Sequence, residues 1–412
     1  MNNPLLVANA IQHARYLAET IGPRPAGSPA EKRGLDYTAT CMAKWGYQVE
    51  HFPVQFAPST AVQYPYMVGI FALAGCGLAL PYLPWLALGL PFLNAALPQW
   101  TMWAARRRKP SAQSENVFAS MQPLLSPSGS IQSMTDEKAE SANPYTSLIL
   151  VAHMDSARAI PFHSRFWLRL YNRTMDIIQR IAVMLSLLGA LHWVGFRLPT
   201  GLLTAGTFIA IFTAAGWLFV QLWGCWRCEY SPGAIDNASG IGVLLALAEY
   251  YASQQPQNLR LGFLFTSSEE TGAHGAAAFA DEFYAQGGHS AILVLDMVGA
   301  GDILRYVSED GVYFPIRTDA RLNQMIKTAY PQASPQKETL RSGDHAAFIR
   351  RGFPTAALQA HGSHQAELAY HSIYDTVELL DSETFDMVVQ CLVDLTVVME
   401  DEISNKSRSI TH

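Results

Sequence analysis

The sequence predicts an α/β fold: a central, mostly parallel mixed sheet with helices on both faces, interrupted by two transmembrane helical hairpins. In the C-terminal half, apolar strand-like runs alternate with helical runs, which is typical of a mainly parallel sheet. Only 15% of the 412 residues are charged, whereas a typical soluble domain has about 25%. The missing charges are concentrated in two segments, which points to membrane insertions in an otherwise ordinary polar domain.

Two helices are expected at the N-terminus. Apolar residues recur at helical spacing as far as Gly22, a loop rich in Gly and Pro follows, and residues 29–45 form the second helix. The apolar face of the first helix consists of Leu6, Ala10, Ala14, Leu17 and Ile21.

Two long segments nearly lack charge. Residues 52–105 contain no Asp, Glu, Lys or Arg, and residues 181–226 contain Arg197 alone. A bilayer-spanning helix needs about 20 apolar residues, so each segment is long enough for two passes. With turns at residues 81–84 and 197–199, we expect transmembrane hairpins at residues 61–105 and 177–226. The alternative is a soluble protein with unusually long buried helices.

Basic residues are distributed unequally about these hairpins. Residues 106–109 are all Arg or Lys and follow the first hairpin, four Arg precede the second, and the opposite side holds Arg197. By the positive-inside rule, the polar part of this integral membrane protein is expected in the cytoplasm. Residues 1–22 lack the uninterrupted apolar core of a signal peptide.

Composition excludes two other classes of protein. The 34 acidic and 28 basic residues give a net charge of −6, which offers no basic field for nucleic acid. Five Cys are too few for a disulfide framework in a chain of this length.

Removing both hairpins leaves three segments, residues 1–60, 106–176 and 227–412, which are expected to form one α/β domain. Residues 121–143 are rich in Ser and predict a surface loop. Strands are expected at residues 116–120, 147–152, 259–266, 291–296 and 355–358. Helices are expected at residues 239–253, 275–286, 321–330 and 382–402.

Acidic and imidazole side chains follow the expected strands. His153 and Asp155 lie two residues apart and share a face, so Asp155 can accept a hydrogen bond from the imidazole and fix its tautomer. Glu269 and Glu270 follow the next strand and point apart, so one can bind a metal while the other faces substrate. A solvated acidic turn is the alternative for this pair.

Two further carboxylates adjoin apolar segments. Asp296 directly follows a strand of five apolar residues, and Asp236 precedes a helix, where it could instead be the N-cap. A buried carboxylate is costly unless it is paired or bound to a metal. His371 is ambiguous by itself. Because functional groups gather at the carboxyl ends of parallel strands, these residues together predict a zinc site, with Mn or Co possible.

These residues lie in motifs that resemble those of the co-catalytic dizinc exopeptidase family, which includes bacterial leucyl aminopeptidases, glutamate carboxypeptidase II and the transferrin receptor. The resemblance covers most of the polar domain, in order. The matching segments are residues 21–28 (IGPRPAGS), 152–156 (AHMDS), 236–240 (DNASG), 268–270 (SEE), 295–297 (LDM), 342–345 (SGDH) and 370–372 (YHS).

The resemblance implies a three-layer zinc-exopeptidase domain that holds two zinc ions. Asp236 would bridge the ions, His153 and Asp296 would complete one site, and Glu270 and His371 the other. One departure is that 82 residues separate His153 from Asp236, where the family has a fairly short loop. The second hairpin lies in this interval, so the bilayer is expected near one edge of the sheet.

The resemblance also assigns roles beyond metal binding. Glu269 would be the general base, Asp155 the orienting carboxylate, and His345 a supporting residue. His274, His361 and His364 are expected to be ordinary loop histidines.

The function implied is that of a membrane-anchored, zinc-dependent aminopeptidase that hydrolyses N-terminal residues from peptides. Two alternatives remain open from the sequence. One is a glutaminyl cyclase-like enzyme with a single zinc, and the other is a non-catalytic membrane receptor or scaffold of the same fold.

Overall fold

The computed structural model describes residues 4–58, 109–122, 124, 145–170, 229–285, 290–311, 315–338 and 342–410, with isolated residues between 191 and 227. The hairpin predicted at residues 61–105 lies outside the described residues, as does that at 177–226 except for the isolated ones. In the described part of the chain, no helix combines the length and the apolar content needed to cross a bilayer.

The described residues form one nine-stranded mixed sheet in the order β1-β2-β4-β3-β5-β9-β6-β7, with β8 paired to β6. The four central strands β4, β3, β5 and β9 are parallel, and antiparallel pairs extend the sheet on both sides. The strands are β1 Gln48–Phe56, β2 Ala112–Ser120, β3 Ser147–His153, β4 Arg260–Thr266, β5 Ala291–Leu295, β6 Ile303–Asp310, β7 Ile316–Arg317, β8 Ser334–Glu338 and β9 Thr355–His361.

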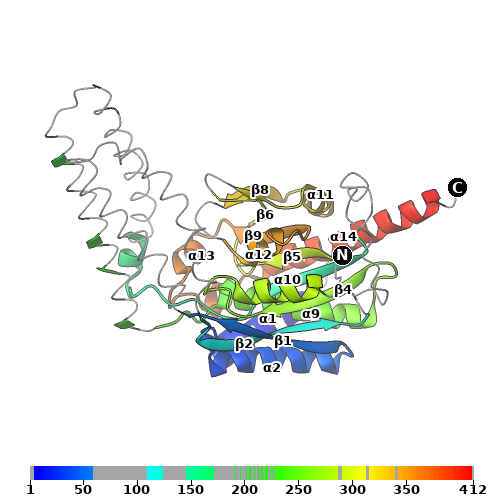
Figure 1. Ribbon diagram of the computed structural model, residues 1–412, viewed down its shortest axis with the longest axis horizontal. Helices are drawn as coiled ribbons and strands as arrows, with labels where there is room; N and C mark the ends of the chain where they lie inside the picture. Colours follow the sequence, from blue (N-terminus) through cyan, green and yellow to red (C-terminus); the bar gives the residue numbers. More distant parts are fainter. Residues whose placement is uncertain are drawn as a thin grey trace.

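Helices cover both faces of this sheet, which gives the three layers that the sequence predicted (Figure 1). α1, α2, α9, α11 and α14 pack on one face, while α10 and α12 pack on the other against a cluster of Phe side chains. The helices are α1 Pro4–Arg15, α2 Pro29–Lys44, α9 Ser239–Ser253, α10 His274–Ala285, α11 Ala320–Ala329, α12 Asp344–Ile349, α13 His364–Ala369 and α14 Ser382–Ile410, with short π-helical turns η1 Tyr16–Ile21 and η3 Ala234–Ala238 and the 3₁₀ turn η4 Val377–Leu379.

The central elements form where the sequence is continuously apolar. Every residue of β3 and of β5 is buried, as expected for parallel strands covered on both faces. Helix α9 is buried over most of its length, and it packs closely on α1. A Cβ at Gly242 would collide with the backbone of Ala10 and Ala14, so glycine is required at this helix crossing.

The sheet is more antiparallel than the alternating sequence pattern implies, because β1, β2, β6 and β7 form antiparallel pairs. Of the nine strands, β1, β6, β7 and β8 were not predicted. β1 includes Phe52, Val54 and Phe56, whose side chains are buried in the domain. The first five residues of the uncharged segment 52–105 therefore belong to the sheet. β8 has the sequence Ser-Pro-Gln-Lys-Glu, which carries no apolar periodicity because it lies beside β6 away from the core.

Candidate metal centre

The structure brings together all five side chains that the sequence identified as metal ligands. His153 is the last residue of β3, and Asp296 directly follows β5. Asp236 lies in η3 before α9, Glu270 follows β4, and His371 follows α13. Three of these residues therefore lie at or just beyond the carboxyl ends of adjacent parallel strands, as expected for an α/β site.

One half of the site is centred on His153. Its Nε2 lies 3.2 Å from Oδ1 of Asp236 and 3.6 Å from Oδ1 of Asp296. The imidazole is almost completely buried. We call these three residues the His153 group.

The other half is centred on His371. Its Nε2 lies 3.3 Å from Oδ2 of Asp236 and 3.2 Å from Oε2 of Glu270. We call His371, Glu270 and Asp236 the His371 group. Asp236 thus belongs to both groups and offers a different carboxylate oxygen to each imidazole.

These separations fit metal ligation. Zinc binds imidazole nitrogen and carboxylate oxygen at about 2.1 Å, so two ligands at a tetrahedral angle lie about 3.4 Å apart. The four N···O distances of 3.2 to 3.6 Å match this spacing. Among the described residues, Oδ1 of Asp296 and Oε1 of Glu270 are buried without a hydrogen-bond partner. Such buried oxygens are costly unless a cation compensates them.

Charges in the site are strongly coupled. Burial opposes the charge on His371, but Glu270 and Asp236 outweigh it and raise its pKa to about 10. Burial likewise opposes the charge on His153, and the surrounding carboxylates raise its pKa well above the usual value. Burial would raise the pKa of Asp236, but the two imidazoles hold it well below its ordinary range. The shared carboxylate is therefore ionised, as a bridging ligand must be.

Glu269 lies beside the metal-type residues. One of its carboxylate oxygens lies within 4.8 Å of ligand atoms of His153 and Glu270. Burial raises the pKa of Glu269 well above its usual value, and the neighbouring Glu270 carboxylate adds to this effect against the opposing influence of His153. A carboxyl group with this environment can accept and hold a proton.

Asp155 acts differently from the prediction. Nδ1 of His153 lies 3.0 Å from the backbone oxygen of Asp155 and 3.7 Å from its carboxylate. The carboxylate instead accepts hydrogen bonds from the backbone N–H groups of Glu269, at 2.9 Å, and Glu270, at 3.0 Å. The His153 tautomer is thus fixed by a main-chain oxygen, and the Asp155 side chain holds the turn that carries both glutamates.

Asp375 supports the shared carboxylate, although the sequence analysis assigned it no role. It accepts hydrogen bonds from the backbone N–H groups of Ile235, at 2.7 Å, and Asp236, at 3.1 Å. Burial raises the pKa of Asp375 to about 7. Its proximity to His371 in the sequence is the signal that could have identified it.

Arg24 is a second supporting residue that the sequence analysis did not identify. Its side chain is completely buried and donates to five backbone oxygens, two of them on Pro232 and Gly233 and one on Met154. The loops before Asp236 and after His153 therefore share one guanidinium. The signal was present, since Arg24 lies in the N-terminal segment that resembles the exopeptidase family.

Glu31 connects helix α2 to the turn after β4 that carries Glu269 and Glu270. Its carboxylate accepts hydrogen bonds from Ser268 N at 3.2 Å, Gly27 N at 2.7 Å and Ser114 Oγ at 2.6 Å. Burial raises the pKa of Glu31 to about 8, and the nearby Asp155 adds to the shift. The Ser28–Glu31 spacing is that of a capping box, in which the Glu has a structural role.

The remaining histidines occupy different surroundings. His345 is buried, with Nε2 3.3 Å from Oδ2 of Asp310, and it belongs to neither group. His274 begins α10, and its ring lies 6.0 Å from that of Phe56. His361 ends β9, and His364 begins α13.

The segment that contains the second predicted hairpin, which we call the second insertion, leaves the domain after residue 160 and re-enters it at residue 229, beside the His371 group. Ala159 N donates to Glu229 O and Ser231 N donates to Ala157 O, both at 2.9 Å, which joins the two ends of the insertion. Ile160 N donates to the backbone oxygen of His371 at 2.8 Å. The base of the insertion therefore contacts the loop that carries a metal-type residue.

Known proteins resemble this chain in part of its sequence and in its fold. A family model described as Peptidase family M28 matches residues 221–396. That range includes Asp236, Glu269, Glu270, Asp296 and His371 and begins after His153. No curated protein sequence matches the chain.

Solved structures share the fold over nearly the whole chain. A leucine aminopeptidase precursor from Bacteroides thetaiotaomicron is 14% identical, with a TM-score of 0.52 over 94% of this chain and 96% of that one. The zinc aminopeptidase BSAP from Bacillus subtilis is 14% identical, with a TM-score of 0.53 over 95% and 94%. A glutaminyl cyclase from Porphyromonas gingivalis is 13% identical, with a TM-score of 0.50 over 95% and 97%. At these identities the likeness is one of fold.

Proposed function

We propose that this protein is a zinc-dependent exopeptidase of Peptidase family M28 that removes N-terminal residues from peptides. The observation that carries the proposal is the position of Asp236, which offers Oδ1 to the His153 group and Oδ2 to the His371 group. One carboxylate shared between two imidazole-carboxylate groups suits two neighbouring metal ions. The match of residues 221–396 to the family model supports the same assignment.

Each group would hold one zinc ion, with Asp236 as the common ligand. His153 and Asp296 would complete the first site, and Glu270 and His371 the second. When bound, zinc lowers the pKa of a water molecule towards neutrality and polarises a carbonyl group.

The chain itself supplies the proton transfer. Glu269 accepts the proton of the water that attacks the scissile carbonyl and returns it to the leaving amino group. Asp155 fixes the backbone of Glu269 through its N–H group, so the base is held in place by the fold. Glu31 fixes the preceding residue, Ser268, from the other side. Asp155 also accepts a hydrogen bond from Glu270 N. The turn after β4 is therefore fixed at three successive backbone N–H groups, those of residues 268–270.

The test is Glu269→Gln, which keeps the size of the side chain and removes its basicity. We expect hydrolysis of aminoacyl substrates to fall by at least about a hundredfold, the usual contribution of a general base. Zinc content should stay at two ions per chain. Glu50→Gln, an exposed position on β1, is the matched control and should leave the rate unchanged. Full turnover in folded, zinc-loaded Glu269→Gln protein would contradict the proposal.

A glutaminyl cyclase-like activity is the second candidate, because the fold is shared with the cyclase of Porphyromonas gingivalis. The two activities differ in product and in metal content. An aminopeptidase releases a free amino acid and should contain two zinc ions, whereas the cyclase-like alternative predicts one zinc and a lactam product from N-terminal Gln. Chelator-sensitive release of amino acids would also exclude the third possibility, a receptor or scaffold without activity.

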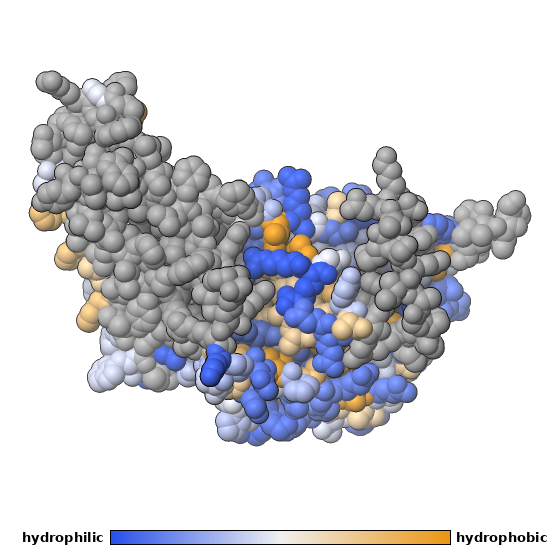
Figure 2. Space-filling view, viewed as in Figure 1, coloured by the Kyte–Doolittle hydropathy of each residue, from blue (hydrophilic) through white to orange (hydrophobic). Residues whose placement is uncertain are grey.

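We further propose that residues 61–105 and 177–226 anchor the protein in a bilayer, with the peptidase domain on the cytoplasmic side. Charge depletion and flanking basic residues support this proposal. So do the described residues of the second segment, among which Phe208, Phe212, Phe219 and Trp226 are 65–83% exposed. In Figure 2, apolar residues of this segment lie at the edge of the molecule away from the sheet.

Reporter fusions test this topology. A reporter after Lys109 should give a cytoplasmic signal, and one near Arg197 should give a signal from the opposite side of the membrane. A non-cytoplasmic signal at Lys109 would overturn the orientation, and extraction of the protein without detergent would overturn the anchoring.

A further inference from the structure

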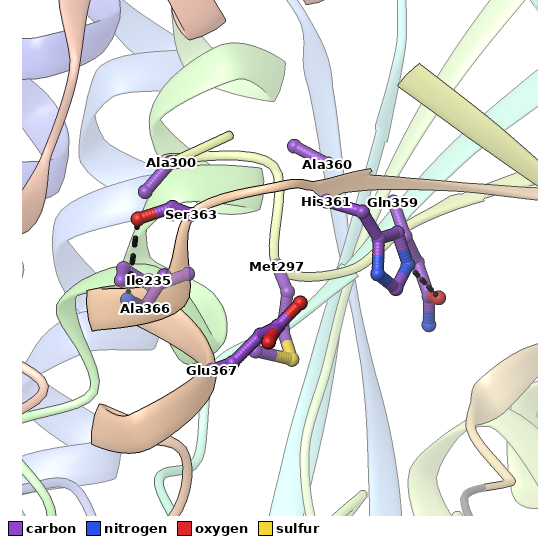
Figure 3. Close-up of a pocket in the computed structure, with 9 residues that line it drawn as sticks. All are labelled: Ile235, Met297, Ala300, Gln359, Ala360, His361, Ser363, Ala366 and Glu367. Carbon is purple, nitrogen blue, oxygen red and sulfur yellow. Dashed lines mark hydrogen bonds between the residues drawn. The ribbon is translucent and has the colours of Figure 1, made fainter. Parts of the chain in front are cut away.

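One pocket is lined by residues that are next in sequence to two of the metal-type residues (Figure 3). Two of its lining residues adjoin metal-type residues in the sequence: Ile235 precedes Asp236, and Met297 follows Asp296. Consecutive Cα atoms are about 3.8 Å apart, so the backbone of the pocket wall is directly joined to that of each carboxylate. The lining residues are Ile235, Met297, Ala300, Gln359, Ala360, His361, Ser363, Ala366 and Glu367.

Hydrogen bonds join the backbone of the pocket walls to the segments that carry Asp236 and Asp296. Ala360 N donates to Met297 O at 3.2 Å, and Asp296 N donates to Leu358 O at 3.1 Å. On the other wall, Ile235 N donates to the carboxylate of Asp375. The pocket is therefore fixed in position relative to the ligands.

The inner surface is apolar. Ile235, Ala300 and Ala366 form a small buried cluster, and the partly buried side chain of Met297 packs against it. The pocket encloses about 360 Å³, part of it open to solvent. The enclosed part of the pocket is small, so it can take no more than one slender side chain with an aliphatic stem.

The pocket also carries negative charge. Glu367 extends from α13 so that its carboxylate lies beside Met297 in the pocket (Figure 3). None of the nine lining residues is Lys or Arg, and the imidazole of His361 contacts the side-chain oxygen of Gln359 at 3.2 Å.

We propose that this pocket receives the side chain of the substrate's N-terminal residue and selects Lys or Arg. The inference rests on the proposed aminopeptidase function. When the scissile carbonyl lies at the metal centre, the side chain of the same residue starts one carbon away and reaches the adjacent pocket. Its methylene groups pack on Met297 and Ile235, and its cationic end pairs with Glu367, which stays in contact with solvent.

The experiment compares substrates that differ at the N-terminal side chain alone. Norleucine has the methylene stem of Lys without the ammonium group, so the kcat/KM ratio of Lys to norleucine substrates isolates the charge. We expect Lys to exceed norleucine by about fivefold, the upper size for an ion pair open to solvent. A substrate with N-terminal Glu should be cleaved more slowly than either.

Glu367→Gln tests the residue itself. We expect it to lower kcat/KM for Lys substrates to the level of norleucine and to leave norleucine unchanged. Glu383→Gln is the matched control, because Glu383 is also an exposed acid in the first turn of a helix, α14, and does not line the pocket. It should change neither rate.

The outcomes separate this inference from the proposed function. Cleavage of norleucine substrates without a preference for Lys overturns the inference alone. An equal loss on Lys and norleucine in Glu367→Gln also overturns it, since Glu367 would then contact a group common to both substrates, such as the α-amine. Failure to cleave any of the three substrates by zinc-loaded protein contradicts the proposed function and the inference together.

Discussion

The two halves of the metal centre share Asp236 but are built from different kinds of structure. His153 ends a strand that is paired on both sides, its side chain is 2% exposed, and its Nδ1 is bonded to the backbone oxygen of Asp155. His371 lies in a loop, its side chain is 28% exposed, and its ring stacks on that of Tyr370 with centroids 3.8 Å apart.

This difference indicates that the His153 imidazole is held rigidly, whereas the His371 imidazole is more accessible to solvent. The His153 group is fixed by the sheet, so its geometry depends on the core of the domain. His371 lies in the loop after α13, and its backbone oxygen accepts a hydrogen bond from Ile160 N at the base of the second insertion. Because the His371 imidazole is the more exposed of the two, we expect an ion bound there to exchange first.

Removing the shared carboxylate should have the largest effect, because it disrupts both halves. Asp236→Ala is expected to lose both zinc ions and to lower hydrolysis by about a thousandfold, equivalent to several kcal/mol of lost catalysis. Metal analysis and kcat/KM measure the two effects. Asp401→Ala, at an exposed position of α14, is the control, and a variant at Asp236 that keeps both ions would refute the bridging role.

Substituting each imidazole separately should distinguish the halves. In metal-free protein, His153→Ala leaves buried carboxylates without their cation and should cost about 3 kcal/mol of unfolding free energy. His371→Ala should cost about 1 kcal/mol, because that side chain is partly exposed. Urea unfolding of the two variants provides the measurement. Equal losses would remove the distinction between a rigid half and an open half.

Chelation should show the same asymmetry in the native protein. We expect zinc to leave in two phases, with the ion of the more exposed His371 group released first. Time-resolved metal release into a chromogenic chelator measures the phases, and His371→Ala should remove the fast one. A single phase that accounts for both ions would contradict this order.

Weakening the hydrogen bonds that position Asp236 should lower zinc affinity at both sites, by less than removing Asp236 itself. Asp375→Asn weakens the two hydrogen bonds that hold Ile235 N and Asp236 N, so zinc affinity should fall by about 10- to 100-fold. Asp319→Asn is a matched control, since Asp319 also accepts a backbone N–H group, at the start of α11. Competition with a chelator of known affinity measures the change, and unchanged affinity would exclude this role for Asp375.

The stability of the metal-free protein should also depend on pH. The pKa of Glu31 rises from 4.5 to about 8 on folding, and that of His371 from 6.5 to about 10. Folding therefore favours the protonated forms, so their contribution to stability is complete at low pH and is lost as pH rises. Between about pH 5 and 8, the Glu31 contribution falls by at most about 1.4 kcal/mol per pH unit.

Urea unfolding across this pH range tests that dependence. Glu31→Gln should flatten the slope between pH 5 and 8 and leave the part that belongs to His371. Stability that rises with pH in the metal-free protein would show that the sign is wrong.

Much of the fold and most of the site could be predicted because their signals are local. Apolar runs identified β3, β4 and β5, and helical periodicity identified α9 with its observed bounds. The carboxylates and imidazoles at the ends of those runs were recognisable because a charged group directly after a buried strand needs a partner. Strands β1, β6, β7 and β8 were not predicted because none contains the continuous buried apolar run that identified the central strands.

By itself, the sequence determined which residue types stand at the ends of the central strands, and thereby the chemistry that the site can perform. Tertiary structure alone decided how these residues are paired. It gave each oxygen of Asp236 a different imidazole, directed the Asp155 carboxylate to the backbone of Glu269 and Glu270, and placed Arg24 between two loops. The physical reason is that side-chain identity is a property of one position, whereas a hydrogen bond or a pocket depends on the distance between positions that only the packed sheet and helices bring together.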